Sequence, residues 1–406
     1  MFSRTTPSRY TARGRPTASR IYCRWIMTPD KIDLHWFAAC APGFEPFLAG
    51  ELRARVPDPD TVRPLPGGVE FDGGMEAGFR ANLEIRSGNR ILLRIGRFYA
   101  TGFPELLRKA ERLNWEAFLT PDRPVDFRVT CRKSRLYHSG AVAERMLRAV
   151  SQRVGFTPRL IPFDEDADDP SQLIVIRLFR DQCLISLDAS GAGLHRRGYR
   201  LETGKAPLRE DLAAAVLLAS GWDRRSALID PFCGSGTIAI EAALMAAGIP
   251  PGRKRKFAFM RWPDYEPNRF EPIREEIVEP ETDDMQIIAA DRDAGAIRIA
   301  RENAARAGVA DRIHFVRQSI SDLISPECRG WIVTNPPYGR RVRSHRDLRD
   351  LYARTGRILH ERFSGWQVTL LTADRGLLRQ TGIRFDASLF FDHGGVKVTA
   401  ARGKIP

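Results

Sequence analysis

The chain has 406 residues, of which 43% are hydrophobic, and a formal net charge of +14 at pH 7. This length predicts two or three domains and allows a large buried core. No apolar run approaches the about 20 residues that cross a bilayer, so we expect a soluble protein with no membrane partner. The positive charge favours a polyanionic partner, although charge alone does not identify nucleic acid.

The six cysteines are far apart in the sequence and form no Cys-x-x-Cys pair. We therefore expect no zinc site, no other metal and no disulfide framework, and a reducing cytoplasm fits this usage.

The first 33 residues are set apart by composition. Residues 1–29 contain six arginines and no acidic residue. Three interpretations are open: a disordered basic arm, an organelle transit peptide, or an extension upstream of a true start at Met27, which we favour. Without those six charges the net charge falls from +14 to +8, so the rest of the chain is still basic.

Two α+β regions are predicted next. Residues 34–100 alternate short strands and helices, which is typical of a small α+β unit. Residues 101–190 predict a further region with a strand at 125–131, a helix at 141–154 and a hairpin around Arg180-Asp181.

From residue 191 to 406 the strand–helix alternation predicts an α/β domain with a mostly parallel sheet and an antiparallel hairpin at its end. Residues 249–285 contain many prolines and charges with no clear core, so we expect an insertion there. The expected parallel strands cover 227–229, 286–290, 313–316, 331–334 and 367–371.

A glycine turn, Asp230-Pro231-Phe232-Cys233-Gly234-Ser235-Gly236-Thr237, lies between an apolar strand and a helical segment. Its glycines allow close backbone approach to a ligand, and the helix start offers free N–H groups. No lysine follows the second glycine, which excludes a Walker loop, and Ala239 replaces the third glycine of the dinucleotide pattern.

Two carboxylates narrow the range of ligands that the turn could bind. Asp230 would repel a pyrophosphate but suits a cation, and Asp291 ends the next apolar strand, where a carboxylate accepts ribose hydroxyls. S-adenosylmethionine has both a ribose and a positive charge. The alternative is that each carboxylate only caps a helix.

Asn335-Pro336-Pro337-Tyr338 follows another apolar strand. The prolines make the turn stiff. It presents an amide oxygen, a backbone carbonyl and an aromatic ring, which together can hold a planar amine. The alternative is a loop that merely ends a strand.

Residues 230–237 and 335–338 resemble the cofactor and target-amine motifs of class I S-adenosylmethionine-dependent amino methyltransferases. The wider chain, roughly residues 35–400, resembles the bacterial THUMP-domain RNA guanine-N2 methyltransferases that act on large-subunit ribosomal RNA. This resemblance implies a ferredoxin-like unit at 34–100, a THUMP RNA-binding region at 101–190 and a Rossmann-like methyltransferase domain at 191–406. Further matching stretches are 40–45, 187–191, 194–200 and 206–210.

The resemblance also implies the reaction. S-adenosylmethionine would donate a methyl group to an exocyclic amine of RNA, with guanine N2 in 23S ribosomal RNA or a pre-ribosomal particle as the expected target. Asn335 and Pro336 would accept the amine hydrogens, and Tyr338 would stack on the flipped base. The expected cofactor residues are Asp230, Phe232, Cys233, Gly234, Ser235, Gly236, Thr237, Asp291, Arg292, Ser319 and Asn335.

One position departs from the family pattern. Such enzymes usually have an acidic residue near the adenine amino group, where this chain has Ser319. Gln318, Ser319 or a backbone contact would then recognise adenine.

Three clusters of cations with aromatic or histidine neighbours are candidates for RNA contact. For each, the alternative is a solvated basic face. Their members are Arg132, Lys133, Arg135 and Tyr137; Arg196, Arg197, Tyr199 and Arg200; and Arg340, Arg341 and Arg343.

Other functions stay open at this point. Asn-Pro-Pro-Tyr also serves enzymes that methylate adenine N6 in DNA or a glutamine amide, and a non-catalytic RNA-binding protein could keep the fold. A dinucleotide oxidoreductase is disfavoured by the terminal hairpin and the incomplete glycine pattern.

Overall fold

The structure is a computed structural model that describes residues 34–56, 58–167, 169–200, 208–276, 286–326, 329–338 and 345–406. The described residues belong to one compact unit. The expectations for residues 1–33 and for the cluster at 340–343 fall outside the described residues.

The first sheet has seven strands in the order β2-β3-β1-β4-β7-β6-β5. β4 pairs antiparallel with β1 along one edge and with β7 along the other. The α+β unit expected over 34–100 and the region expected over 101–190 therefore share one continuous sheet. The strands are β1 Leu34–Ala39, β2 Arg63–Leu65, β3 Gly68–Gly73, β4 Arg90–Tyr99, β5 Val125–Arg132, β6 Gln172–Phe179 and β7 Gln182–Asp188.

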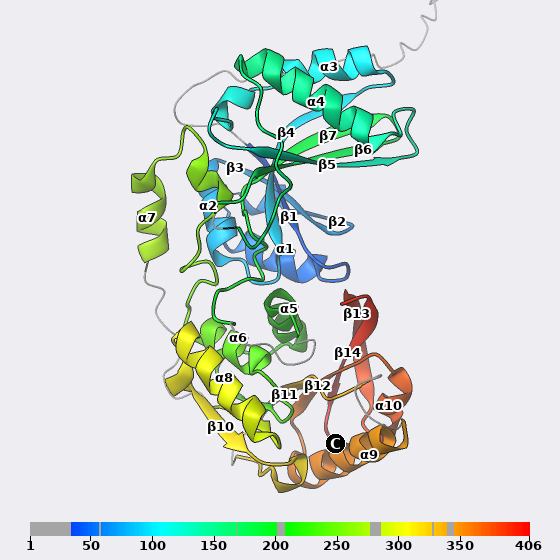
Figure 1. Cartoon of the computed structure of the whole chain (residues 1–406). Helices are drawn as coiled ribbons and strands as arrows, with labels where there is room; N and C mark the ends of the chain where they lie inside the picture. Colours follow the sequence, from blue (N-terminus) through cyan, green and yellow to red (C-terminus); the bar gives the residue numbers. More distant parts are fainter. Residues whose placement is uncertain are drawn as a thin grey trace, which may run out of the picture. The chain divides into compact units, whose positions relative to one another are not determined.

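Helices α3 and α4 pack together against the β4–β7–β6–β5 part of this sheet (Figure 1). They bury Leu106, Met146 and Val150. The hairpin predicted around Arg180-Asp181 is confirmed, and both residues have the positive φ, 51° and 62°, that a tight two-residue turn requires. The helices of this half are α1 Glu45–Arg53, α2 Met75–Glu84, α3 Phe103–Glu111 and α4 Ser139–Val154.

The second sheet also has seven strands, in the order β10-β9-β8-β11-β12-β14-β13. The first five are parallel, whereas β14 runs antiparallel to both of its neighbours. The predicted parallel strands and terminal hairpin are thus confirmed. The strands are β8 Ala227–Asp230, β9 Ile287–Asp291, β10 Ile313–Arg317, β11 Gly330–Thr334, β12 Gln367–Thr372, β13 Phe385–His393 and β14 Val396–Lys404.

Helices cover both faces of the second sheet. Ile229, Ile332 and Leu370 join side chains of α9 and α10 in one core cluster. Because side chains alternate along a strand, Leu228 and Val333 face the other side, where α6 and α8 pack. The helices are α5 Glu210–Ser220, α6 Thr237–Ala246, α7 Pro267–Glu275, α8 Ala294–Ala307, α9 His345–Arg362 and α10 Arg375–Gln380.

The stretch expected as an insertion at 249–285 has a packed core, which its sequence did not indicate. Phe257, Phe259 and Phe270 are buried and pack on one another, and Phe259 lies 4.6 Å from the ring of Phe79 in α2. α7 packs against α2. The aromatic residues are irregularly spaced, so they gave no periodic signal in the sequence.

None of the helices in the described part of the chain is long and apolar enough to cross a membrane. Among the same residues, no group of three or more His, Cys, Asp or Glu side chains is placed to hold a metal ion.

Candidate active site

The carboxyl ends of β8, β9 and β11 lie side by side, because β8 pairs in parallel with β9 on one side and with β11 on the other. Asp230 and Asp291 are the last residues of β8 and β9, and Asn335 follows the end of β11. The strand order reverses at this point, and open α/β sheets bind their ligands in the crevice there. The fold thus brings together the three polar residues that the sequence singled out.

The two glycines of the turn have different reasons to be glycine. Both adopt the left-handed conformation, with φ of 53° at Gly234 and 83° at Gly236. A Cβ on Gly236 would lie 2.9 Å from Cβ of Ala300 in α8, whereas a Cβ on Gly234 would meet no described atom within 4 Å. Gly236 therefore allows the turn to pack on α8, and Gly234 leaves open space beside the backbone.

Hydrogen bonds hold the turn in place. The Cys233 N–H donates to the Ala290 carbonyl at 3.0 Å, and the Asn303 amide donates to the Ser235 carbonyl at 3.1 Å. Asn303 is fully buried in α8. Sequence reasoning missed Asn303, although an amide on the buried side of an amphipathic helix signals a polar partner.

Asp230 is buried, and its side chain forms a hydrogen bond that joins the ends of β8 and β11. Its Oδ1 accepts hydrogen bonds from the Thr334 hydroxyl at 2.6 Å and from the Phe232 N–H at 3.3 Å. Burial raises the pKa of Asp230 to about 7, while those two hydrogen bonds oppose the rise and the charge of Asp291 adds to it. Sequence reasoning missed Thr334, which is the last residue of β11.

Asp291 links β9 to the glycine turn. Its Oδ2 accepts from the Gly234 N–H at 3.1 Å, and its Oδ1 accepts from the Asp293 N–H at 2.9 Å. The residue that caps α8 is Asp293, and the cap position of α6 is Gly236. The alternative that Asp230 and Asp291 are helix caps is therefore excluded. Each oxygen of Asp291 keeps a further lone pair that can accept a ribose hydroxyl.

Asn335 carries an amide oxygen without a partner. Its Oδ1 is buried and accepts no hydrogen bond in the described part of the chain. A buried acceptor left unsatisfied costs about 1–3 kcal/mol, so this atom favours a bound donor. Tyr338 is itself buried. The ring that is expected to stack on the base thus has little exposed surface in this structure.

The remaining cofactor candidates differ in access. Cys233 is buried, and burial raises the pKa of its thiol well above the usual range, so the thiol is not a nucleophile. Phe232 packs partly against the core cluster. Thr237 begins α6, and its hydroxyl accepts from the Arg200 guanidinium at 2.7 Å.

The far end of the site is formed by Arg292, which is exposed, and by the residues after β10. The Gln318 N–H donates to the Asp291 carbonyl at 3.0 Å. The Ser319 hydroxyl accepts from the Ser321 N–H at 3.1 Å, where it caps a short 3₁₀ helix, Ile320–Asp322. That hydroxyl still has its own hydrogen to donate.

Of the cationic clusters, the first is on the surface. Arg132, Lys133, Arg135 and Tyr137 are all exposed. This exposure is compatible with RNA contact.

The second cluster is mostly structural, which corrects the prediction. Arg197 is buried, donates to the carbonyl oxygens of Leu194 and Arg86, and lies 3.7 Å from Glu241. Tyr199 is buried too and donates to Glu241 at 3.0 Å. The side chains of Arg197 and Tyr199 are thus buried and bound to internal partners.

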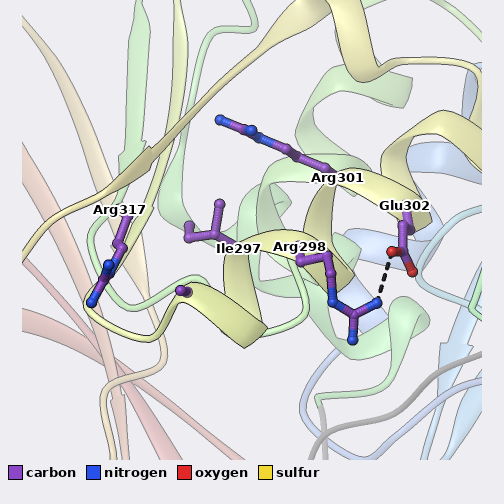
Figure 2. A pocket seen from close by; sticks show the side chains of 6 residues that line it. Ile297, Arg298, Arg301, Glu302 and Arg317 are labelled. Carbon is purple, nitrogen blue, oxygen red and sulfur yellow. Dashed lines mark hydrogen bonds and ion pairs between the residues drawn. The ribbon is translucent and has the colours of Figure 1, made fainter.

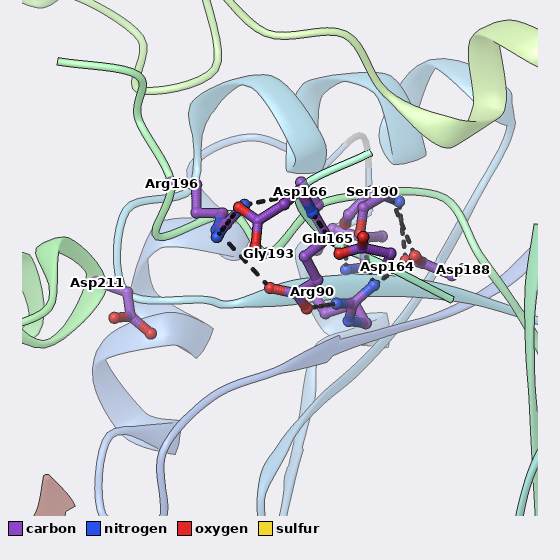
Figure 3. A network of polar contacts seen from close by, with 12 residues as sticks. Arg90, Asp164, Glu165, Asp166, Asp188, Ser190, Gly193, Arg196 and Asp211 are labelled. Atoms are coloured by element: carbon purple, nitrogen blue, oxygen red, sulfur yellow. Dashed lines mark hydrogen bonds and ion pairs between the residues drawn. The ribbon is translucent and has the colours of Figure 1, made fainter. Parts of the chain in front are cut away.

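Arg196 is half-exposed but belongs to a polar network (Figure 3). Its guanidinium pairs with Asp166 at 2.6 Å and donates to the Glu165 carbonyl at 2.8 Å. Arg90 pairs with the Glu165 and Asp188 carboxylates in the same network. Arg196 therefore has internal partners that an RNA phosphate would have to displace.

A separate open cleft lies beside α8 and the end of β10 (Figure 2). Arg301 donates from it to the Phe315 carbonyl at 2.9 Å, and Arg298 pairs with Glu302 at 2.8 Å. Its lining includes none of the predicted cofactor residues. The lining residues are Ala294, Ile297, Arg298, Arg301, Glu302 and Arg317.

Comparison with known proteins gives three family matches along the chain. Residues 197–386 match the family described as RMKL-like, methyltransferase domain. Residues 35–92 match the RlmL ferredoxin-like domain, and residues 100–188 match the THUMP domain.

Two curated relatives differ in length. A putative RNA methyltransferase from Synechocystis is 31% identical over 90% of this chain and 95% of its own length. A ribosomal RNA large subunit methyltransferase K/L from Syntrophotalea carbinolica is 38% identical over 86% of this chain and 51% of its own length. The chain thus spans about half the length of the K/L relatives that it matches.

Two solved structures resemble nearly the whole chain. A putative methyltransferase complexed with SAH is 28% identical, with a TM-score of 0.79 over 93% of this chain and 99% of that chain. A protein from Listeria monocytogenes described as a predicted N6-adenine-specific DNA methylase is 30% identical, with a TM-score of 0.80 over 92% of this chain and 97% of that chain.

Proposed function

Because the chain belongs to the RMKL-like methyltransferase family, we propose that it transfers a methyl group from S-adenosylmethionine to an exocyclic amine of RNA. The observation that carries this proposal is the buried Asn335 amide oxygen at the switch point of the second sheet, which accepts no hydrogen bond from any residue that the structure describes. The THUMP match and the names of the relatives support RNA as the substrate class.

The residues at the strand ends fit the cofactor. Asp291 would accept the ribose hydroxyls, Asp230 would face the positive charge, and Gly234 would let the ligand lie against the backbone, where a Cβ would meet no described atom within 4 Å. When bound, S-adenosylmethionine supplies an activated methyl group on a positively charged sulfur. Ser319 and Gln318, which follow β10, would contact the adenine.

The amine would be held by acceptors. Asn335 Oδ1 and the Pro336 carbonyl would each accept one hydrogen of the amine, which turns its lone pair out of the plane of the base. The rate gain then comes mainly from positioning. Stacking of a flipped base on Tyr338 would require its ring, which is buried here, to be uncovered.

Guanine N2 of 23S ribosomal RNA, free or in a pre-ribosomal particle, is the target that we propose. Its support is the likeness to ribosomal RNA large subunit methyltransferases K/L. The runner-up is adenine N6 of DNA, which the name of the Listeria protein suggests. The Asn-Pro-Pro-Tyr turn suits either amine, and the THUMP match together with the names of the K/L relatives favours the RNA amine.

Nucleoside mass spectrometry of ribosomal RNA from a deletion strain tests the proposal. We expect a loss of N2-methylguanosine that wild-type protein restores and Asn335→Ala does not. Loss of N6-methyladenine from DNA instead would establish the runner-up. Absence of any heat with S-adenosylmethionine in calorimetry would favour a non-catalytic RNA-binding protein.

A further inference from the structure

Four residues form a row across the first sheet, on the face opposite α3 and α4. Tyr99 of β4 is opposite Gln182 of β7, Gln182 is opposite Phe179 of β6, and Phe179 is opposite Arg132 of β5. Residues directly opposite one another point to the same face of a sheet. Tyr99 is 62% exposed and Phe179 is 50% exposed, so two large rings lie open on this face.

A second row lies two residues along the strands, on the same face. Arg97 is opposite Leu184, Leu184 is opposite Arg177, and Arg177 is opposite Thr130. Arg128 comes two residues before Thr130 on β5 and so points the same way. Arg97, Arg128, Thr130 and Arg177 are exposed. The two rows, together with Arg128, are called the open sheet face below.

The open sheet face is strongly positive. Within the described part of the chain, Arg128, Arg132 and Arg177 have no carboxylate at ion-pair distance, and Arg97 reaches only Glu70, at 3.3 Å. The Arg180 guanidinium lies 5.2 Å from the centre of the Phe179 ring. Positively charged side chains therefore surround the two exposed rings.

We propose that the open sheet face binds single-stranded RNA, with unpaired bases stacked on Tyr99 and Phe179 and the backbone phosphates paired with Arg97, Arg128, Arg132 and Arg177. This inference rests on the proposed action on RNA and adds where and in what form the RNA is held. Stacking on aromatic rings combined with a cationic surface is the physical basis of binding to single strands. A sheet that presents exposed aromatic residues reads unpaired bases in this way.

The geometry favours an unpaired strand over a duplex. Tyr99 and Phe179 are separated by β7, hence by about 10 Å at the usual strand spacing. Each ring would therefore take its own base, and only unpaired bases expose their flat faces to a protein surface. Duplex RNA offers phosphates and sugars, which would use the arginines but not the rings.

The charge of this surface favours an occupant of opposite charge. Arg97, Arg128, Arg132 and Arg177 are all positively charged, so the occupant is a polyanion.

Binding of the full chain to a labelled mixed-sequence RNA of about 12 nucleotides, and to the same strand annealed to its complement, tests the proposal by fluorescence anisotropy. Tyr99→Ala and Phe179→Ala are each expected to weaken binding of the single strand about 5- to 100-fold, as loss of one stacked base does. The ring-conserving variants Tyr99→Phe and Phe179→Tyr are expected to bind like the wild type.

Phe390→Ala is the matched control. Phe390 is 53% exposed, and the Arg375 guanidinium lies 5.3 Å from its ring centre. It thus repeats the exposure and cationic neighbour of Phe179, but on β13 of the other sheet. We expect its removal to leave RNA binding unchanged.

Single-strand binding that survives both alanine substitutions would overturn the proposal. A loss of affinity in Phe390→Ala as large as in Tyr99→Ala and Phe179→Ala would also overturn it. So would a duplex that binds as tightly as the single strand and loses as much affinity on those two substitutions. Those results leave the methyl-transfer assignment intact, because it depends on loss of N2-methylguanosine in the deletion strain. Wild-type protein that does not bind the labelled single strand would likewise overturn the proposal for the open sheet face and leave the methyl-transfer assignment to the deletion strain.

Discussion

The Thr334 hydroxyl donates a 2.6 Å hydrogen bond to Oδ1 of Asp230 and so joins the carboxyl ends of β11 and β8. Both side chains are buried. This bond stabilises the ionised form of a carboxylate whose pKa burial raises to about 7. One hydroxyl group therefore links the strand that we propose to hold the amine to the strand that we propose to hold the cofactor.

Affinity for S-adenosylmethionine is expected to fall as the pH drops below about 7, because Asp230 then carries a proton and loses the charge that attracts a cation. The raised pKa places this loss of affinity near neutral pH. As the pH falls further below the pKa, the affinity drops by about tenfold per pH unit. Calorimetry across about pH 6 to 8 measures it.

Thr334→Val removes a hydrogen bond that lowers the pKa of Asp230, so the midpoint of this pH dependence is expected to shift upward. Thr334→Ser keeps the hydroxyl and serves as the control. Asp230→Asn is expected to bind weakly at every pH. Affinity in the wild type that does not change with pH would contradict the role of Asp230.

Asn335→Ala is expected to reduce turnover about 10²- to 10³-fold, which is the usual cost of removing one positioned partner of a reacting group. Cofactor affinity should change little, because the hydrogen bonds that hold the glycine turn do not involve Asn335. Single-turnover methylation of ribosomal RNA and calorimetry with S-adenosylmethionine separate the two effects. Equal losses of both would show that Asn335 acts mainly on the cofactor.

The two glycines of the turn should respond differently to alanine. Both substitutions incur about 1–2 kcal/mol for a left-handed non-glycine residue. Gly236→Ala also forces a contact with Ala300 and should lower the melting temperature further. Gly234→Ala has room for its methyl group and should mainly weaken cofactor binding. Thermal melts and calorimetry on both variants check this; a larger loss of stability in Gly234→Ala would reverse the assignment.

Arg197→Ala and Arg132→Ala form a contrasting pair. Without Arg197, the buried Glu241 carboxylate keeps the neutral Tyr199 hydroxyl as a partner but loses a positive charge beside it. This loss should lower the free energy of unfolding by about 3–5 kcal/mol. Arg132 is exposed, so its loss should leave stability unchanged and reduce the salt dependence of RNA binding by about one phosphate contact. Denaturant titration and binding at several salt concentrations measure the two effects.

The second sheet was predictable from the sequence because buried parallel strands are short, continuous apolar runs, and each stood out. The pairing of β4 with both β1 and β7 was not predictable, because it joins β4 to a strand about 50–60 residues earlier and to one about 80–100 residues later in the chain. The aromatic cluster of Phe257, Phe259 and Phe270 was missed because its spacing follows no helix or strand period.

At the site, Asp230, Asp291 and Asn335 were found because each stands at or just after an apolar strand, and parallel strands end at the same edge of a sheet. Thr334, which bonds Asp230, and Asn303, which bonds the Ser235 carbonyl, were missed because only the tertiary fold brings them within reach of these partners. Arg197 was misassigned for a related reason: a run of arginines does not reveal which one faces a buried glutamate.

The double pairing of β4 also limits how the chain can be divided. A cut beside this ten-residue strand would strip one of its edges of hydrogen-bond partners along most of its length. Long, bare strand edges recruit other chains and aggregate. Neither the ferredoxin-like half nor the THUMP half should therefore survive excision as a monomer, and the contribution of each to RNA binding has to be measured by substitutions in the intact protein.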